Sequence, residues 1–395
     1  MTASPTAIPK PQRSFSVEEF EGRTQRAQAM MHAAQIDALW VMTEPDMAYF
    51  SGYNSYFWQS PTRPWFLVIP ATGKPIALVP SLGAAAVSRT WLDEVRTWPS
   101  PNPMDEGIGL LTQTLKDCAR TFGRVGAPLG PETHLRLPAN DVAQLRANLG
   151  STDIVDATDI VRELRMVKSP HEIEKHAYIC SCVSSTFEAM PTLIQSGMSE
   201  WEAFQNIRIN LIQQGVDSAP FLTTISGPGG VDDAIRLPTD RVMEPGDLVF
   251  IDTGSEFDNH YSDFDRNFAL NHASDAAKRA YALCHRALDA GIAAARPGVR
   301  ACDIWQAMAA VLAESGTSAS AIGRMGHGVG LRNTEWPSLM DGDETPIREG
   351  MVLAIEPGYE FAPGKLMLHE ENVVIRSHGA ELLSRRAAPE LPILG

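Results

Sequence analysis

The sequence predicts two domains, an α/β domain followed by an α+β domain. The chain has 395 residues, which exceeds the roughly 100–200 residues of a typical single domain. Its first part alternates helical and strand patterns, and its second part has strand-like runs at hairpin distances between long helices. We expect the boundary near residues 161–169 and assign the domains to 1–165 and 166–395.

The first domain begins with a helix and a strand. Apolar residues have helical spacing over 17–34, and the run IDALWVM then indicates a short strand. The sequence before them, over 1–13, is rich in Pro, Ser and Thr, which is typical of a flexible arm or a strap onto another subunit. Two further strands are expected at 64–70 and 75–80, and two helical stretches at 82–95 and 106–123.

The second domain opens with a long helix from residue 170. Ser169 is a good N-cap, Pro170 suits the first helical position, and Glu172 lies in the first turn, where the helix dipole favours negative charge. The strand runs are DLVFIDTGSEF, DFDRNFAL, MVLAIEPGYEF and ENVVIRS. Further helices are expected at 199–214, 274–296 and 301–316. Together these patterns indicate a curved, largely antiparallel sheet flanked by helices.

Composition excludes several classes of function. The net charge is -15 without any basic run, so nucleic-acid binding is not expected. No stretch approaches the roughly 18 apolar residues of a membrane span, and the N-terminus lacks the apolar core of a signal peptide, which predicts a cytoplasmic protein that binds no membrane. The five scattered cysteines are typical of reduced thiols.

Five residues of the second domain form a candidate metal site. Asp252 and Asp263 lie on two strand runs that can pair across GSEFDNH, which would place both carboxylates on one side of the sheet. His327 stands among glycines in GHGVG, where a metal can approach closely. Glu356 interrupts one strand and Glu370 precedes another. Oxygen-rich donors with one imidazole are what two neighbouring divalent ions require.

These motifs carry a specific resemblance. The ordered series FIDTGSEF, SDFDRNF, GHGVGL, AIEPGY and HEENVVI resembles the prolidase, aminopeptidase P and creatinase family of pita-bread metallohydrolases. The resemblance implies a creatinase- or prolidase-like α/β domain before a pita-bread catalytic domain. It also implies that Asp252 binds one metal, that Asp263 and Glu370 bridge the pair, and that His327 and Glu356 hold the second metal and serve catalysis. Glu371 is the rival for Glu370.

The implied chemistry is hydrolysis with a metal-activated water. Two divalent ions would lower the pKa of a bridging water and polarise a substrate carbonyl. Oxygen-dominated ligation favours Mn²⁺ or Fe²⁺, while Co²⁺ or Zn²⁺ are possible.

The sequence departs from its peptide-cleaving relatives at two outer histidines. The resemblance places Ile235 where one histidine is usual, or Arg236 if the alignment has a gap, and Thr334 where the other is usual. A rebuilt pocket would draw on Arg236, Arg332, Asn333 and Thr334 to contact a substrate anion or amide. We therefore expect slow Xaa-Pro cleavage, since isoleucine cannot transfer protons.

An aromatic segment at 49–66 offers a further contact. Most of its rings are expected in the core of the first domain or at a dimer contact. The resemblance implies a homodimer in which this segment, and Trp58 in particular, reaches the neighbouring active site, where it could bind a cationic or zwitterionic ligand.

Three functions follow from these expectations. The leading one is hydrolysis of a small amide or peptide C–N bond, of the Xaa-Pro peptidase type with an altered pocket. The alternative is a non-peptide reaction, either a lyase like the dimethylsulfoniopropionate lyase of this family or a hydrolase of the ectoine or creatine type. A non-catalytic binding protein is the third, and it is disfavoured because all five metal-site residues are present.

Overall fold

A computed structural model of the chain describes residues 8–60, 63–316 and 323–395. These residues separate into two compact units. One consists of Gln12–Arg165, and the other consists of Met166–Gly395 together with residues 8–11. Of the arm predicted at 1–13, residues 1–7 lie outside the described residues. Lys10 belongs with the second unit, because its ammonium group lies 5.3 Å from the centre of the Phe257 ring.

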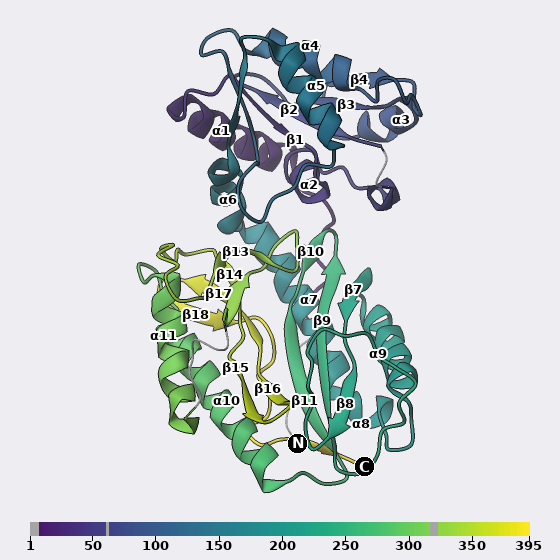
Figure 1. Ribbon diagram of the computed structural model, residues 1–395, viewed down its shortest axis with the longest axis vertical. Coiled ribbons are helices and arrows are strands. Elements are labelled where there is room, and N and C mark those ends of the chain that lie inside the picture. Colours follow the sequence, from purple (N-terminus) through teal and green to yellow (C-terminus); the bar gives the residue numbers. More distant parts are fainter. Residues whose placement is uncertain (1–7, 61–62, 317–322) are drawn as a thin grey trace. The chain divides into compact units, whose positions relative to one another are not determined.

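The N-terminal unit is built on one mixed six-stranded sheet (Figure 1). Its order is β4-β3-β2-β1-β5-β6, with antiparallel pairing of β1 to β2 and parallel pairing of β1 to β5. The strands are β1 (Ala38–Val41), β2 (Phe66–Pro70), β3 (Ile76–Pro80), β4 (Glu94–Trp98), β5 (Arg124–Ala127) and β6 (Asp153–Asp156). The helices are α1 (Val17–Ala33), α2 (Glu44–Ser51), α3 (Ala84–Val87), α4 (Ile108–Cys118), α5 (Ala139–Leu149) and α6 (Thr158–Met166).

One predicted helix in this unit is wrong over most of its length. Within 82–95, a short 3-10 turn (Ser81–Gly83) leads into the short helix α3, which ends at Val87, and the last residues of the stretch already belong to β4. This strand pairs in parallel with β3 at the edge of the sheet, and Trp98 is its one buried residue. An exposed edge strand lacks the apolar run by which a strand can be predicted from sequence.

The C-terminal unit has two groups of strands. In the first, the order is β10-β9-β11-β19, and β7 and β8 also pair with β9; in the second, it is β13-β12-β14-β17-β18. The first group comprises β7 (Ser218–Leu222), β8 (Ile225–Pro228), β9 (Asp247–Phe257), β10 (His260–Tyr261), β11 (Phe264–Leu270) and β19 (Ile393–Leu394). The second comprises β12 (Gly326–Gly328), β13 (Glu335–Ser338), β14 (Val352–Ile355), β17 (Glu371–Arg376) and β18 (Gly379–Leu382), while β15 (Gly358–Ala362) and β16 (Lys365–Leu368) form a separate hairpin.

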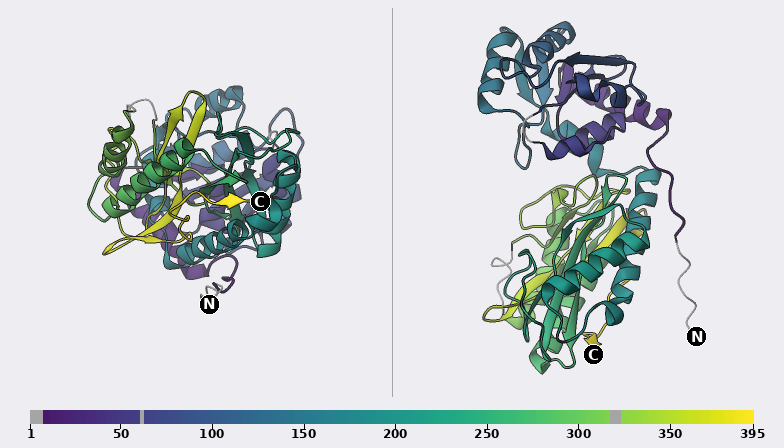
Figure 2. Two further views of the ribbon diagram at one scale, coloured as in Figure 1. Left: turned by 90° about the horizontal axis from the view of Figure 1, so that it is seen from below. Right: turned by 90° about the vertical axis from the view of Figure 1, so that its right-hand side faces the viewer.

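Each group of strands packs against its own pair of helices (Figure 1). Ile179 of α7 and Phe204 of α9 share a buried apolar cluster with Ile251 of β9. Residues of α10 and α11 share another with β14 and β17. Figure 2 shows these long helices running alongside the strands. The helices are α7 (Pro170–Glu188), α8 (Met190–Leu193), α9 (Glu200–Gln214), α10 (Asp275–Ala294) and α11 (Ala301–Leu312).

The start of α7 is as predicted. The Ser169 hydroxyl accepts a hydrogen bond from the Glu172 N–H at 3.3 Å, and the Glu172 carboxylate accepts one from the Ser169 N–H at 2.9 Å. This reciprocal capping box fixes where the helix begins. Among the described helices, none is both long and apolar enough to cross a membrane.

Candidate metal centre

The hairpin of β9 and β11 places three aspartates on one face. The turn between β9 and β10, the short strand that precedes β11, consists of Asp258 and Asn259, whose φ values of 50° and 66° are those that a two-residue type I′ turn requires. In the resulting register Asp252 lies directly opposite Asp265. Because side chains alternate along a strand, Asp263 shares the face of Asp265. Asp252 and Asp263 were predicted from the sequence to share this face, whereas Asp265 was not predicted as a site residue.

Three of the predicted ligands converge. Each of Asp263, His327 and Glu370 offers an atom within 4.8 Å of the other two, and all three side chains are buried. His327 Nε2 lies 3.4 Å from Asp263 Oδ2. His327 Nδ1 lies 3.0 Å from the Gly328 carbonyl oxygen. A proton on Nδ1 would donate to that carbonyl and leave the Nε2 lone pair for a metal ion.

Asp252 and Glu356 lie outside this tight group, although their charges act on it. Burial raises the pKa of Asp263 well above its usual range, and the Asp252 and Glu356 carboxylates raise it further. The pKa values of Asp252 and Glu370 are raised well above their usual range, first by burial and then by neighbouring carboxylates. Burial also raises the pKa of Glu356, to about 7. Such carboxylates repel one another unless a cation or protons intervene.

The donor atoms fit divalent metal ions. Asp252 Oδ1, Asp263 Oδ1 and Glu370 Oε1 are buried without a hydrogen-bond partner among the described residues. Unpaired buried carboxylate oxygens are costly, and coordination to a cation would satisfy them. Burial, followed by the charge of Arg324, lowers the pKa of His327 to about 4, so its imidazole is neutral, as a metal ligand must be.

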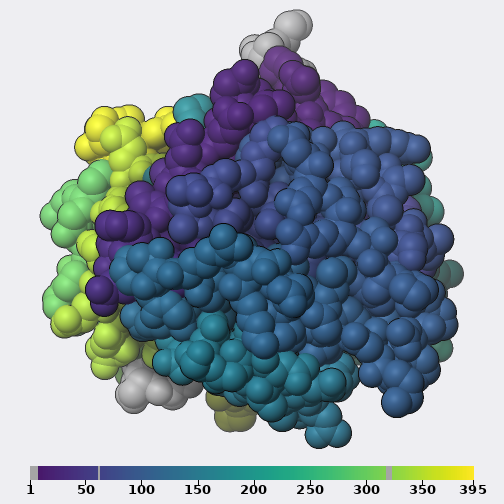
Figure 3. Space-filling view, turned by 90° about the horizontal axis from the view of Figure 1, so that it is seen from above, coloured from purple at the N-terminus to yellow at the C-terminus, as the bar shows by residue number. Residues whose placement is uncertain are grey.

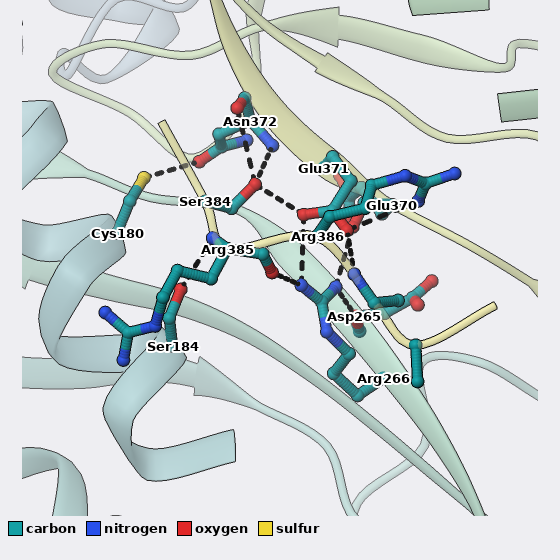
Figure 4. Close-up of polar contacts among 12 residues, drawn as sticks. Cys180, Ser184, Asp265, Arg266, Glu370, Glu371, Asn372, Ser384, Arg385 and Arg386 are labelled. Atoms are coloured by element: carbon teal, nitrogen blue, oxygen red, sulfur yellow. Dashed lines mark hydrogen bonds and ion pairs between the residues drawn. The ribbon is translucent and has the colours of Figure 1, made fainter. Parts of the chain in front are cut away.

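Glu371 has a different environment from Glu370 (Figure 4). Its carboxylate accepts hydrogen bonds from Arg266 Nη2 at 3.0 Å, from the Ala387 N–H at 2.8 Å and from the Ser384 hydroxyl. A guanidinium nitrogen of Arg386 adds a contact at 3.4 Å. Both Glu371 oxygens are therefore engaged by the protein itself, whereas Glu370 belongs to the converging group. This contrast favours Glu370 as the ligand.

Of the residues expected to contact substrate, Asn333 is the one that reaches the metal site. Its side chain interacts with the Asp263 carboxyl and counters part of the rise in the pKa of that group. The Asn333 amide also packs on Gly254, since a Cβ built there would lie 1.9 Å from Asn333 Oδ1. Arg332 and Thr334, on either side, are exposed to solvent. Their predicted contacts with substrate therefore stay predictions.

The remaining predicted substrate residues have other surroundings. Arg236 forms a two-point ion pair with the buried carboxylate of Glu200, with both distances at 2.8 Å. Its predicted role would require this pair to break. Ile235 is 76% exposed. Trp58 packs against Trp65, with ring centres 5.9 Å apart, and against the Arg136 guanidinium, so its described contacts are structural.

Sequence reasoning missed an arginine at this site. Arg324 is exposed and lies three residues before His327. Its positive charge lowers the pKa values of Asp263, Glu356 and His327. Proximity in sequence to GHGVG was the available signal. The arginines predicted from the sequence to bind substrate were Arg332 and Arg236.

Known proteins resemble both units of the chain. The family model described as "Creatinase/Prolidase N-terminal domain" matches residues 23–167, and the model described as "Metallopeptidase family M24" matches residues 174–377. The "Probable dipeptidase PepE" of Mycobacterium bovis is 29% identical over 368 residues, which cover 92% of this chain and 93% of that relative. The "Xaa-Pro dipeptidase" of Pyrococcus horikoshii is 28% identical over 251 residues, covering 63% of this chain and 71% of the relative.

Solved structures agree with the fold. Dipeptidase PepE from Mycobacterium ulcerans superposes with a TM-score of 0.83 at 27% identity, covering 96% of this chain and 99% of that one. Prolidase from Thermococcus sibiricus gives a TM-score of 0.85 at 22% identity, over 95% and 99% of the two chains, and supports the fold alone. The predicted fold class and the family resemblance are confirmed. Members of this family use divalent metal ions, and the chain is a metal-dependent hydrolase that belongs to metallopeptidase family M24.

Proposed function

We propose that the chain hydrolyses the C–N bond of a dipeptide, or of a similar small amide that carries a carboxylate, at a centre of two divalent ions. The proposed ligands are Asp252, Asp263, His327, Glu356 and Glu370. The observation that carries the proposal is the convergence of buried carboxylates lacking hydrogen-bond partners with a neutral imidazole. The names of the relatives, dipeptidase and Xaa-Pro dipeptidase, support the substrate class. Mn²⁺ or Fe²⁺ suits these donors.

The protein residues have distinct roles in this proposal. The bound ions would supply an activated water and polarise the scissile carbonyl. Glu356 would hold an ion together with His327 and would also serve catalysis by accepting and returning a proton. Asn333 orients the Asp263 carboxyl, and the exposed Arg324 guanidinium can pair with a substrate carboxylate.

The test is hydrolysis by the metal-free protein after loading with Mn²⁺, Fe²⁺, Co²⁺ or Zn²⁺ separately. The substrates are Ala-Pro, Ala-Ala, the tripeptide Ala-Pro-Ala, and small cyclic amidines and betaines. Metal-dependent release of a free amine supports the proposal. If the metal-loaded protein cleaves none of these C–N bonds, the proposal is wrong.

The rate on Xaa-Pro dipeptides tests the altered pocket. Loss of a positioned acid or base costs about 10²–10⁴ in rate. With Ile235 and Thr334 in place of the outer histidines, we expect kcat/KM for Ala-Pro well below about 10⁵ M⁻¹s⁻¹. Faster turnover of another carboxylate-bearing amide would fit. A value near 10⁵ M⁻¹s⁻¹ would contradict the idea that the pocket has changed function.

A second candidate is elimination across a carboxylate-bearing substrate. The absence of a histidine at Thr334, which is exposed, favours it, because leaving-group protonation at that position would be lacking. Reaction in H₂¹⁸O separates the two chemistries. Hydrolysis of an amide incorporates one labelled oxygen into the new carboxylate, while elimination leaves the product unlabelled.

We also infer a homodimer in the cytoplasm. The surface of the N-terminal unit, one face of which appears in Figure 3, includes apolar side chains that are strongly exposed, among them Tyr56 at 91% and Met104 at 88%. Two-fold dimers are the commonest oligomers and would cover such residues. All five cysteines are free thiols, as a reducing compartment favours. Light scattering at micromolar concentration tests the dimer, and a fully active monomer would contradict it.

A further inference from the structure

Asp265 is a buried carboxylate to which neither the sequence nor the proposed function assigns a role. Its side chain is fully buried in the described structure, and neither Oδ1 nor Oδ2 has a hydrogen-bond partner there. It lies on β11, directly opposite Asp252 of β9. A single residue separates it from Asp263, so by strand alternation all three carboxylates leave the sheet on the same side.

The surroundings of Asp265 do not neutralise it. The carboxylate that faces it across the strand pair is Asp252, whose Oδ1 is also buried without a hydrogen-bond partner among the described residues. Arg266 is the adjacent cation, but its guanidinium donates to the Glu371 carboxylate at 3.0 Å and to the Glu370 carbonyl at 3.1 Å. An isolated carboxylate in such a place costs several kcal/mol unless a cation accompanies it.

We propose that Asp265 is a further ligand of the metal centre and shares a divalent ion with Asp252. This inference rests on the metal centre of the proposed function. Side chains directly opposite in an antiparallel pair have Cβ atoms about 4.5–5.5 Å apart, so two short carboxylates can reach one cation between them. An additional oxygen donor makes that position harder in the chemical sense. It should therefore favour Mn²⁺ over Zn²⁺, which prefers fewer ligands that include nitrogen or sulfur.

The test measures metal binding rather than turnover. Metal-free wild type, Asp265→Asn and the control Glu256→Gln are titrated with Mn²⁺ and with Zn²⁺ against a fluorescent chelator, and bound metal per chain is counted after dialysis. Glu256 is a partly buried carboxylate of β9, the strand that carries Asp252, and it accepts a hydrogen bond from the Ser218 hydroxyl. We expect wild type and Glu256→Gln to bind two ions. Asp265→Asn should bind one of them at least tenfold more weakly, with Mn²⁺ affected more than Zn²⁺.

A second variant guards against a folding defect. Asp265→Leu fills the same buried site with an apolar side chain, and in the metal-free state it should melt no lower than wild type while losing the same affinity. If either Asp265 variant folds and binds both ions with wild-type affinity, Asp265 is not a ligand.

The same titration separates this inference from the proposed metal centre. Asp263→Asn should lose both ions, since Asp263 is the proposed bridge. If Asp263→Asn loses both ions while the Asp265 variants keep them, only the inference about Asp265 fails. If wild type binds no divalent ion, or Asp263→Asn retains both, the proposed centre itself is wrong.

Discussion

Asn372 and Asp263 are joined by two hydrogen bonds between a side chain and a backbone. Asn372 Oδ1 accepts from the Asp263 N–H at 2.9 Å, and Asn372 Nδ2 donates to the Asp263 carbonyl at 2.6 Å. Glu370 lies two residues before Asn372, so this amide holds two proposed ligands from different sheets side by side. The site is therefore organised by protein contacts before any ion binds.

Replacing Asn372 should lower both the metal affinity and the stability of the protein. Asn372→Ala removes two buried hydrogen bonds and leaves the Asp263 backbone unpaired, at a cost of about 1–3 kcal/mol for each unsatisfied group. We expect lower metal affinity as well as lower stability, measured by chelator competition and urea unfolding. The control Asn206→Ala removes a partly buried amide of α9 that donates to the Leu193 carbonyl, and it should alter stability but not metal affinity.

Glu370 and Glu371 should differ in what their loss affects. Glu371→Gln breaks a buried pair with Arg266 and should destabilise the folded protein by about 3–5 kcal/mol. Glu370→Gln should abolish tight metal binding yet leave the metal-free protein at least as stable as wild type, because it removes a repelled charge. Thermal melts and metal analysis of both variants test this. The reverse pattern would make Glu371 the ligand.

Gly254 should be required because of Asn333. The Cβ of Gly254→Ala would overlap the Asn333 amide, and overpacking of this kind costs about 1–3 kcal/mol. We expect displaced Asn333 to lose its contact with Asp263, which should also weaken metal binding. In the double variant with Asn333→Ala, the added cost of Gly254→Ala should largely disappear. Additive losses of stability would mean that the two residues act independently.

Because the pKa of Glu356 is raised, the stability difference between Glu356→Gln and wild type should change sign when metal binds. In the metal-free protein its pKa is about 7 rather than the ordinary 4.5, so folding favours the protonated acid. That stabilisation is present below pH 4.5 and is lost as pH rises through 7. The neutral variant Glu356→Gln should therefore become progressively more stable than wild type over this window, and metal should reverse the order. Melting temperatures from pH 4.5 to 8.5, with and without Mn²⁺, measure both differences.

Arg324 should recognise a substrate carboxylate. For a substrate that the protein hydrolyses, Arg324→Met should raise KM about tenfold, the value of one charge-assisted hydrogen bond. The KM for the C-terminal amide of the same substrate, which lacks the carboxylate, should not change in Arg324→Met. Arg296→Met is the matched control, an exposed arginine of the same unit to which no role in substrate binding is assigned. If both variants change KM equally for both substrates, Arg324 does not bind the substrate carboxylate specifically, and the arginines act only through a general electrostatic attraction of the substrate.

Several features were determined by the sequence alone. Ser169 and Glu172 specify the start of α7 because capping involves residues three positions apart. The apolar run that ends in Asp252 predicted β9, and the ordered motifs predicted the family. Hairpin alternation was also sufficient, in principle, to find Asp265, because its face follows from that of Asp263.

Other features were decided only by tertiary structure. The sequence placed Glu370 and Glu371 side by side, but which carboxylate is free depends on Arg266, Ser384 and Ala387, which approach from elsewhere in the chain. The same holds for Asn333, which reaches Asp263 because Gly254 leaves room for it. The sequence offered Arg236 as a substrate-binding residue, but in the structure its guanidinium is paired with Glu200. Local patterns fix periodicity and caps, whereas the pairing of buried charges depends on contacts between distant segments, and no local pattern encodes those.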